Sequence, residues 1–336
     1  MRVLVTGCAG FIGMHCAERL LARGDEVVGI DDLNAYYAVT LKRDRLARLE
    51  GRPGFRFAQF DLAAPGTLAA LMTKERPDAV LHLAAQAGVR YSLENPAAYV
   101  QANLVAFANL LEACRHQPPR HLVYASSSSV YGGNTRLPWS ERDNVDHPVS
   151  LYAATKKSNE LMAHAYSHLY GLPATGLRYF TVYGPWGRPD MSPILFAHAI
   201  MKGEPIRVFN RGDMQRDFTY IDDIAEGTLR VLDAPAAPDP GFDAARPDPA
   251  TSWAPWRVCN IGNHQAVGLL AYIDALERAL GKTTTKELLP MQPGDVQATY
   301  ADTARLDALV GFAPSTPLDV GLARFAQWFR PYFGYT

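Results

Sequence analysis

The sequence predicts an α/β protein with a doubly wound parallel sheet and a smaller mixed α/β domain in the C-terminal part. Short apolar runs alternate with amphipathic helical patterns through the first half of the chain. Such alternation is typical of parallel strands joined by helices, and continuous apolar runs are typical of strands buried on both faces. The chain has 336 residues, 48% of them hydrophobic, which is enough apolar material for a large core.

The predicted strands and helices of this sheet follow one another in order along the chain. The strands are expected at residues 2–7, 26–31, 55–62, 78–85, 120–127 and 173–180. Helical patterns lie between them at 11–23, 66–75, 99–115 and 151–170. Because helices separate the apolar runs, neighbouring strands can run parallel.

The pattern changes after Thr181, where prolines crowd a loop before a predicted helix at 193–202. Residues 234–255 are rich in Pro, Ala and Asp without periodicity, which predicts a surface loop. A further strand is expected at 256–262.

These changes predict two domains. The first covers residues 1–180, and the segments 217–233 and 256–262 return to it. The second covers residues 181–336.

Composition excludes several classes of function. A net charge of −1 gives no electrostatic footprint for nucleic acid or an anionic membrane surface. The first residues begin a strand at once, so no signal peptide is expected, and no apolar run approaches the ~20 residues of a membrane helix. The four cysteines lack metal-ligand spacing, which predicts reduced thiols in a cytoplasmic protein without a metal site.

A glycine-rich turn joins the first predicted strand to the first predicted helix. The run "VTGCAGFIG" places Gly7, Gly10 and Gly13 in the pattern G-x-x-G-x-x-G, with Phe11 and Ile12 between the last two glycines. Backbone N–H groups at such a turn face a phosphate, and the glycines let a pyrophosphate approach. A strand before and a helix after the turn predict a dinucleotide-binding Rossmann domain.

Residues at strand ends complete the predicted cofactor site. Asp31 ends the second strand, where a carboxylate can bind both ribose hydroxyls and would repel a 2′-phosphate, so NAD is favoured over NADP. Asp32 is an alternative for this role, but strand register favours Asp31. Asp61 and Leu62 follow the third strand and are placed to border the adenine, although a strand-terminating Asp is an equally good interpretation.

Tyr152 and Lys156 are the predicted catalytic pair. They are four residues apart and therefore neighbours on one helical face. A nearby ammonium, together with the positive nicotinamide ring, favours the phenolate and lowers the pKa of the phenol. The run "SSSSVYG" follows the fifth strand, at the edge where open α/β sheets bind ligands. We expect Ser127 to relay a proton to the tyrosine and Ser126 to be structural.

With these motifs together, the chain resembles the extended short-chain dehydrogenases/reductases of the nucleotide-sugar epimerase group, most closely the UDP-glucuronate 4-epimerases. The resemblance rests on "TGCAGFIG", "LHLAAQAGVRYS", "SSSSVYG", "YAATKKSNE", "RYFTVYGPWGRPDM", "RDFTYIDD" and "MQPGDV", which span nearly the whole chain.

The resemblance implies a reaction in three steps. Tyr152 takes the proton of the sugar C4 hydroxyl while C4 gives its hydride to tightly held NAD, the 4-keto sugar turns over, and the hydride returns to its other face. Lys156 would also anchor the nicotinamide ribose, and Ser127 would bind the substrate oxygen. A homodimer through the helices at 99–115 and 151–170 is expected from the resemblance alone.

Several residues are expected to select the sugar. UDP-galactose 4-epimerases typically carry Asn where this chain has Thr181. The hydroxyls of Thr181, Ser128 and Ser129 can donate to a C6 carboxylate, and Arg188 supplies a cation near the same end of the cleft. We hypothesise that the three hydroxyls hold this carboxylate out of the alignment that a 4-keto-uronate needs to lose CO₂. Arg188 could instead bind phosphate or shape its loop.

Further residues are assigned by resemblance to the nucleotide end of a UDP-sugar. Residues 206–210 would line the uracil with Phe209 nearby, Arg216 would bind the pyrophosphate, and Asp295 would lie near the uridine ribose. Arg90 is a substrate-side or cofactor-side cation, with a structural salt bridge an equal interpretation.

Three alternatives to UDP-glucuronate 4-epimerisation stay open. They are a UDP-glucose/UDP-galactose 4-epimerase, a UDP-glucuronate decarboxylase, and a non-catalytic NAD-binding regulatory protein.

Overall fold

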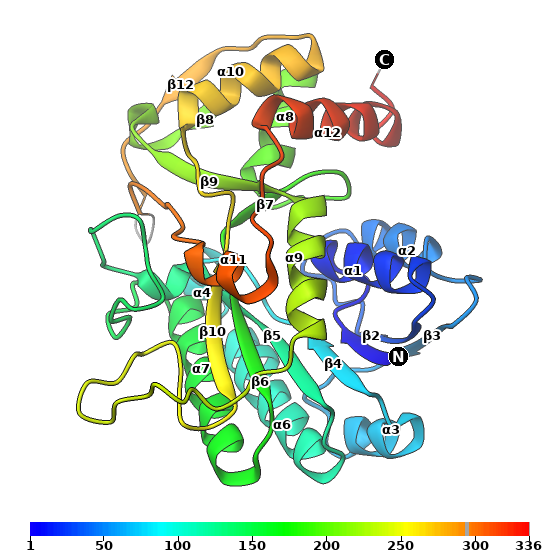
Figure 1. Ribbon diagram of the computed structural model, residues 1–336. Coiled ribbons are helices and arrows are strands. Elements are labelled where there is room, and N and C mark those ends of the chain that lie inside the picture. The colour runs from blue at the N-terminus through cyan, green and yellow to red at the C-terminus, as the bar shows by residue number, and fades with distance from the viewer. Residues whose placement is uncertain (293–295, 336) are drawn as a thin grey trace.

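A seven-stranded parallel sheet forms the centre of the computed structural model, which describes residues 1–292 and 296–335 (Figure 1). The strand order is β10-β6-β5-β4-β1-β2-β3. The strands are β1 (Arg2–Thr6), β2 (Glu26–Asp31), β3 (Phe55–Gln59), β4 (Ala79–His82), β5 (His121–Ser127), β6 (Ala174–Tyr179) and β10 (Trp256–Ile261). The order reverses between β1 and β4, so the predicted doubly wound Rossmann sheet is confirmed.

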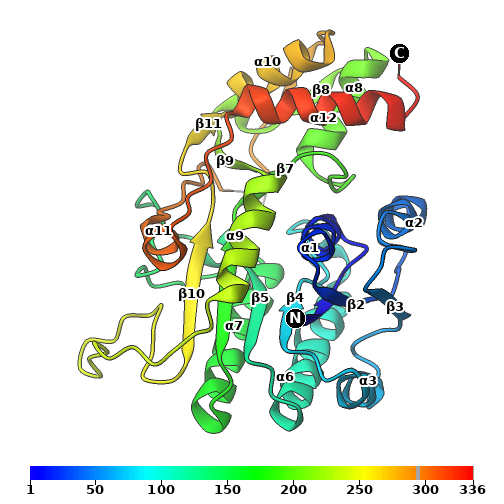
Figure 2. The same cartoon turned by 45° about the vertical axis from the view of Figure 1, so that its right-hand side comes forward.

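Both faces of the sheet are buried because helices cover both. Side chains of β1 alternate between two cores: Val3 and Val5 pack in the core that α1 (Phe11–Ala22) and α9 (Ile221–Asp233) share, whereas Leu4 packs with α6 (Ala106–His116) on the other face. Figure 2 shows α1 and α9 side by side. This two-sided burial explains the continuous apolar runs in the sequence.

The other helices of this part are α2 (Val39–Ala47), α3 (Thr67–Glu75), α4 (Tyr91–Glu94), α5 (Pro96–Tyr99) and α7 (Leu151–Tyr170). The helix predicted at 99–115 is interrupted, because a π-helix at Val100–Val105 lies between α5 and α6. The strand predicted at 55–62 ends at Gln59, which leaves the residues after it in a turn. No helix was predicted at 39–47.

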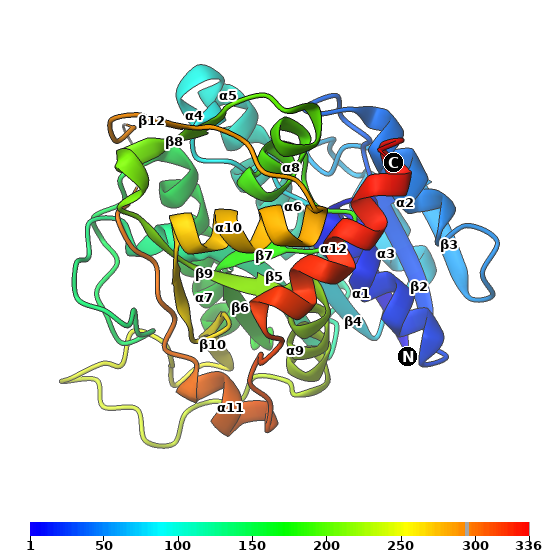
Figure 3. The same ribbon diagram turned by 90° about the horizontal axis from the view of Figure 1, so that it is seen from above.

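A smaller group of elements lies above the carboxyl edge of the sheet. Its strands form a three-stranded sheet of β7 (Thr181–Tyr183), β9 (Gln215–Tyr220) and β11 (Ala266–Gly268), and a pair of β8 (Ile206–Val208) and β12 (Lys286–Leu288). Its helices are α8 (Ser192–Lys202), α10 (Leu269–Leu280) and α12 (Leu318–Tyr332), whereas α11 (Ala304–Val310) packs beside α9 and β10. Seen from above, α10 and α12 cross over the large sheet (Figure 3).

Two elements from the second half of the chain join the first domain. Strand β10 pairs in parallel with β6, and α9 packs on α1. The prediction that residues 217–233 return to the first domain is wrong for residues 217–220, which lie in β9 of the small sheet. Between α9 and β10, residues 234–255 contain no helix or strand.

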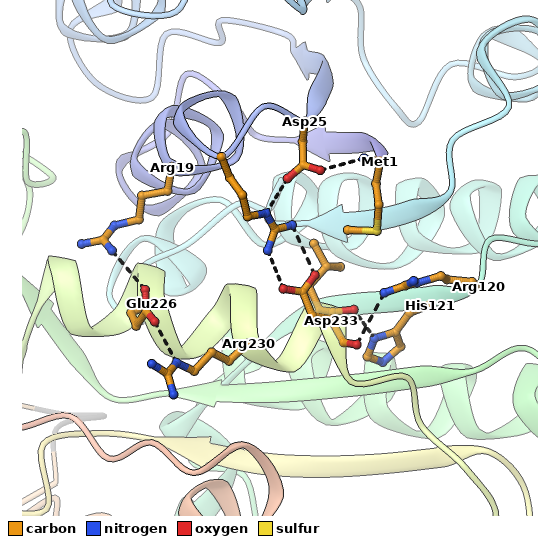
Figure 4. A network of polar contacts seen from close by, with 10 residues as sticks. Met1, Arg19, Asp25, Arg120, His121, Glu226, Arg230 and Asp233 are labelled. Atoms are coloured by element: carbon orange, nitrogen blue, oxygen red, sulfur yellow. Dashed lines mark hydrogen bonds and ion pairs between the residues drawn. The ribbon is translucent and has the colours of Figure 1, made fainter.

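Polar contacts hold the C-terminal end of α9 against the first domain (Figure 4). Asp233 forms an ion pair with Arg23, and Arg23 also donates to Asp25, which binds the amino terminus of Met1. From β5, His121 donates to the carbonyl of Leu232. Within the described residues, no helix is long and apolar enough to span a bilayer.

Candidate active site

A cleft of about 350 Å³ lies at the carboxyl edge of the seven-stranded sheet and brings together most of the predicted site residues. Its lining includes Gly7, Gly10, Phe11, Ile12, Gly13, Asp31, Asp61, Leu62, Ser127, Ser128, Ser129, Tyr152, Lys156, Thr181 and Arg188. Asp32 and Ser126 also line it. The predicted residues that it leaves out are Arg90, Phe209 and Arg216, while Asp295 lies outside the described residues.

The glycine turn has room only for glycine. A Cβ on Gly7, whose φ is +70°, would lie 2.7 Å from the backbone nitrogen of Ala84. One on Gly13 would lie 2.1 Å from the carbonyl oxygen of Gly7, which itself accepts a hydrogen bond from the Gly10 nitrogen at 2.9 Å. Such a close-packed turn at the start of α1 fits the pyrophosphate of a dinucleotide.

The carboxylate of Asp31 is held in place by backbone groups. It accepts hydrogen bonds from the nitrogens of Ala9 and Leu33, at 3.2 and 2.9 Å. Burial raises its pKa above the usual value, and the positive charge of Lys42 opposes that effect. Asp32 instead binds the side chain of Asn34. Both carboxylates line the cleft, so their assignment to the ribose stays a prediction.

Asp61 and Leu62 lie in the turn after β3. The carboxylate of Asp61 accepts from the backbone nitrogen of Ala63 at 2.8 Å, and the Leu62 carbonyl accepts from Asn109 at 2.9 Å. Asp61 is therefore a turn-capping residue as well as a lining residue of the cleft.

The first two serines of the run at the end of β5 have different partners. Ser126 donates to the buried carboxylate of Glu160 at 2.6 Å. Ser127 hydrogen-bonds Tyr152, and its hydroxyl accepts from the Ser129 nitrogen at 3.1 Å. Successive residues of a strand point to opposite sides, which is why neighbours in sequence reach different partners.

Tyr152 and Lys156 lie on the first turns of α7, which begins at a Ser150 cap. Burial raises the pKa of the Tyr152 phenol, whereas the hydrogen bond with Ser127 and the charge of Arg188 lower it. Burial also lowers the pKa of Lys156 to about 8, and its ammonium donates to the Ala125 carbonyl at 2.8 Å. The charge of Arg188 therefore favours the phenolate of Tyr152.

Arg188 is held by an acidic residue of its own loop. Its guanidinium donates to both oxygens of Asp190, one of them at 3.1 Å, and Tyr36 donates to the same carboxylate at 3.0 Å. Burial lowers the pKa of Arg188, but Asp190 more than offsets this and the net direction is upward. Tyr36 also lines the cleft. Asp190 and Tyr36 were not singled out in the sequence, although "RPD" places an acid two residues after the arginine.

The residues assigned to the nucleotide end lie in the smaller domain and beside it. The ring of Phe209 has two guanidiniums near it, with Arg90 at 5.2 Å and Arg207 at 5.6 Å from its centre. Arg216 donates to the carbonyls of Gln215 and Gln297. Arg90 and Phe209 are thus brought together, while Arg216 stands apart on β9.

Residues 34–42 contribute several cleft residues that the sequence did not reveal. Asn34, Tyr37 and Lys42 all line the cleft, and Lys42 donates to Asn34 at 3.0 Å. The run "YYAVTLKRDRL" has no motif that indicates a ligand site, and only the fold shows that the charge of Lys42 acts on the carboxylate of Asp31.

Comparisons with known proteins identify the family. Residues 3–243 match the model of the NAD dependent epimerase/dehydratase family. The chain belongs to this family. It is 51% identical over 333 residues to "Protein CapI" of Staphylococcus aureus, with 99% of both chains covered. It is 48% identical over 333 residues to a "Probable UDP-glucuronate 4-epimerase" of Rhizobium meliloti, covering 98% of this chain and 97% of that one.

A solved structure of similar shape is UDP-glucuronic acid 4-epimerase from Bacillus cereus, in complex with UDP-glucuronic acid and NAD. It has a TM-score of 0.87 and 34% identity, with 99% of this chain and 100% of that chain covered. The predicted relationship to the nucleotide-sugar epimerases is confirmed, and with it an isomerase that uses NAD.

Proposed function

We propose that this enzyme interconverts UDP-glucuronate and UDP-galacturonate by inverting C4 of the sugar. One observation carries the proposal: Ser128, Ser129, Thr181 and Arg188 line the same cleft as Tyr152. Three hydroxyls and a guanidinium are suited to a C6 carboxylate, since charge-assisted hydrogen bonds are about twice as strong as neutral ones. The relatives with this name are consistent with it.

Each residue near Tyr152 has a role in the proposed reaction. Tyr152, as phenolate, removes the proton of the C4 hydroxyl, and Ser127 holds the C4 oxygen and relays the proton. Lys156 anchors the nicotinamide ribose. NAD, which the glycine turn and Asp31 would hold, would supply the hydride acceptor and donor for C4. Between the two transfers the 4-keto sugar turns over about its pyrophosphate bonds, while Tyr152 keeps the proton.

The proposed division of labour follows the two domains. Residues 1–180, with α9 and β10, bind NAD through the glycine turn, Asp31, Asp61 and Leu62. Residues 181–336 bind the UDP part, with Arg216 at the pyrophosphate and Phe209, beside Arg90, at the uracil. Asp295 is kept as a ribose ligand by resemblance only.

Incubating the purified protein with UDP-glucuronate and no added NAD tests the proposal directly. We expect UDP-galacturonate to form, because tightly held NAD would be carried through purification, and NMR of the product distinguishes the outcomes. Conversion of UDP-glucose alone would favour the neutral-sugar epimerase, and a UDP-pentose would favour the decarboxylase. No turnover of either sugar would favour a regulatory protein.

Thr181→Ala tests how the carboxylate is held. With one hydroxyl lost, the 4-keto intermediate should release more UDP-pentose than the parent enzyme does, because the carboxylate is freer to align with the carbonyl. An unchanged ratio of pentose to epimer would contradict the proposed role of Thr181.

We also propose a homodimer in the cytoplasm, with helices of the 99–115 and 151–170 regions at the interface. The π-helix and α7 expose large apolar side chains, among them Val100, Val105 and Leu161, at 41%, 38% and 59%. Light scattering should give twice the mass of one chain, and Leu161→Glu should lower it.

A further inference from the structure

Arg45, on α2, is fully buried and uses all three of its guanidinium nitrogens. Nε and Nη2 donate to the Trp186 carbonyl at 3.0 and 2.7 Å, and Nη2 also donates to the Gly187 carbonyl at 2.9 Å. Nη1 donates to the Ala9 carbonyl at 3.3 Å and to the Tyr37 hydroxyl at 2.7 Å. Its partners therefore come from three separate segments of the chain.

No carboxylate among the described residues lies within ion-pair distance of Arg45. Its acceptors are backbone carbonyls and a phenol, and a buried charge without a counter-ion is costly. A residue chosen for stability alone would be apolar here. This cost indicates that the site requires the guanidinium itself, a planar group with five N–H donors.

The three segments are those that surround the cleft. Ala9 belongs to the glycine turn, Tyr37 lines the cleft, and Trp186 and Gly187 directly precede Arg188. Arg45 thus ties the loop that carries Arg188 to the turn that is expected to hold the cofactor.

The backbone at Trp186 is strained. Its φ of +65° is in the left-handed region, which is an outlier for a bulky side chain. Such conformations persist only where the surroundings enforce them. Two donors from Arg45 bind its carbonyl, while its ring packs against Trp328 and Tyr332 and beneath the guanidinium of Arg48.

We propose that Arg45 is a positioning residue that fixes the Arg188 loop to the cofactor turn. Without it, Trp186 can leave the left-handed conformation and Arg188 can move away from Tyr152, while the Ala9 carbonyl loses a donor in the glycine turn. The effect on substrate rests on the proposed function, but the effect on the cofactor turn does not.

The test compares Arg45→Met, Arg45→Lys and the control Arg43→Met. Arg43 lies on the same helix and is exposed, so the control removes an arginine of α2 without the three-way contact. For Arg45→Met we expect a KM for UDP-glucuronate raised about ten- to hundredfold. The acid limb of kcat/KM should move to higher pH, and NAD should dissociate faster. Arg45→Lys keeps the charge without the fork and should lie between, while Arg43→Met should match the parent.

Three outcomes would overturn the proposal. One is an Arg45→Met protein with parental KM, pH limb and NAD dissociation rate; another is an Arg45→Lys protein that behaves as the parent, which would mean that charge alone suffices. The third is an Arg43→Met protein as impaired as Arg45→Met. If Arg45→Met does not fold, Arg45→Lys decides by the same readouts. If the parent does not convert UDP-glucuronate, the proposed function fails, and the NAD dissociation rates still decide the role of Arg45.

Discussion

Two neighbouring sets of side chains lie where β5 meets α7: a cleft set, and a buried set of which only Ser126 also reaches the cleft lining. The cleft set is Ser127, Tyr152 and Lys156, and the buried set is Ser126, Glu160 and Arg178. Tyr152, Lys156 and Glu160 are spaced by four residues and so lie along one stripe of α7. Each set also takes one serine from the end of β5.

The two sets differ in how their charges are compensated. In the buried set, the Glu160 carboxylate accepts from Arg178 at 2.8 and 2.9 Å and from Ser126 at 2.6 Å, so both charges are neutralised. In the cleft set, the ammonium of Lys156 donates to the Ala125 carbonyl and forms no ion pair within the part of the chain that the structure describes. Burial lowers the pKa of Lys156 and raises that of Tyr152, which favours the neutral form of both groups. Uncompensated groups at a cleft are typical of sites that act on a ligand.

Tyr152→Phe should have the largest effect on activity, and this effect should be limited to the cleft set. The variant loses the proposed proton acceptor, so kcat for UDP-glucuronate should fall by about 10²- to 10⁴-fold. NAD content and urea midpoint should match the parent, because the ring remains. Tyr170→Phe, on the exposed end of α7, is the matched control. A Tyr152→Phe protein within tenfold of the parental kcat would break the distinction between the two sets.

Glu160→Gln should instead affect the buried set and lower the stability of the fold. Removing the carboxylate leaves the guanidinium of Arg178 buried without a counter-ion, which typically costs about 3–5 kcal/mol of folding free energy. Urea unfolding measures the loss. Glu226→Gln, which breaks surface pairs with Arg19 and Arg230, should cost less than about 1 kcal/mol. Equal losses in the two variants would mean that the buried set is not the scaffold inferred here.

The sequence was sufficient for the parts whose chemistry is local. The glycine turn, the Tyr152/Lys156 spacing and the serines lie in short runs, and strand and helix periodicity placed those runs at one edge of a sheet. The sequence did not predict helix α2, because two of its four buried residues, Lys42 and Arg45, are charged and interrupt the apolar face. Periodicity detects a hydrophobic face, and here polar contacts replace it.

Contacts between distant segments could not be predicted either. Asp190, which binds Arg188, also accepts a hydrogen bond from Tyr36, 154 residues away in the chain. Arg45 likewise reaches Trp186 across 141 residues. Nothing in the spacing of such residues indicates that they meet, because the fold alone brings them together. The residues that the sequence did not reveal are therefore those that hold other site residues in place, and the predicted ones are those that belong to a sequence motif.

The shifted pKa of Lys156 predicts how stability depends on pH. The folded-state value is about 8 and the unfolded value 10.5, so below pH 8 the folded protein carries the full cost of a buried ammonium. Between pH 8 and 10.5 only the unfolded chain keeps the proton, and the free energy of unfolding should rise by up to about 3 kcal/mol.

Urea unfolding with NAD absent measures this rise. Lys156→Met should abolish it, and Lys157→Met, at a neighbouring position that is less buried, should keep it. Ionisation of tyrosines at high pH affects all three proteins alike, so the difference between variants isolates Lys156. A rise that survives in Lys156→Met would have to come from another group.

The smallest effects should come from the serines, and they separate the two sets most sharply. Ser126→Ala removes one donor from the Glu160 carboxylate and should cost about 1–2 kcal/mol of stability, with kcat of the folded protein retained. Ser127→Ala should lower kcat at least about tenfold, because the proposed relay to Tyr152 is lost. Its stability cost should be below about 1 kcal/mol, for the lost contact with Ser129. The two substitutions are identical and adjacent, so composition and solvent exposure cannot explain opposite outcomes. If both variants lost only activity, or both lost only stability, the alternation of side chains along β5 would not separate a structural serine from a catalytic one.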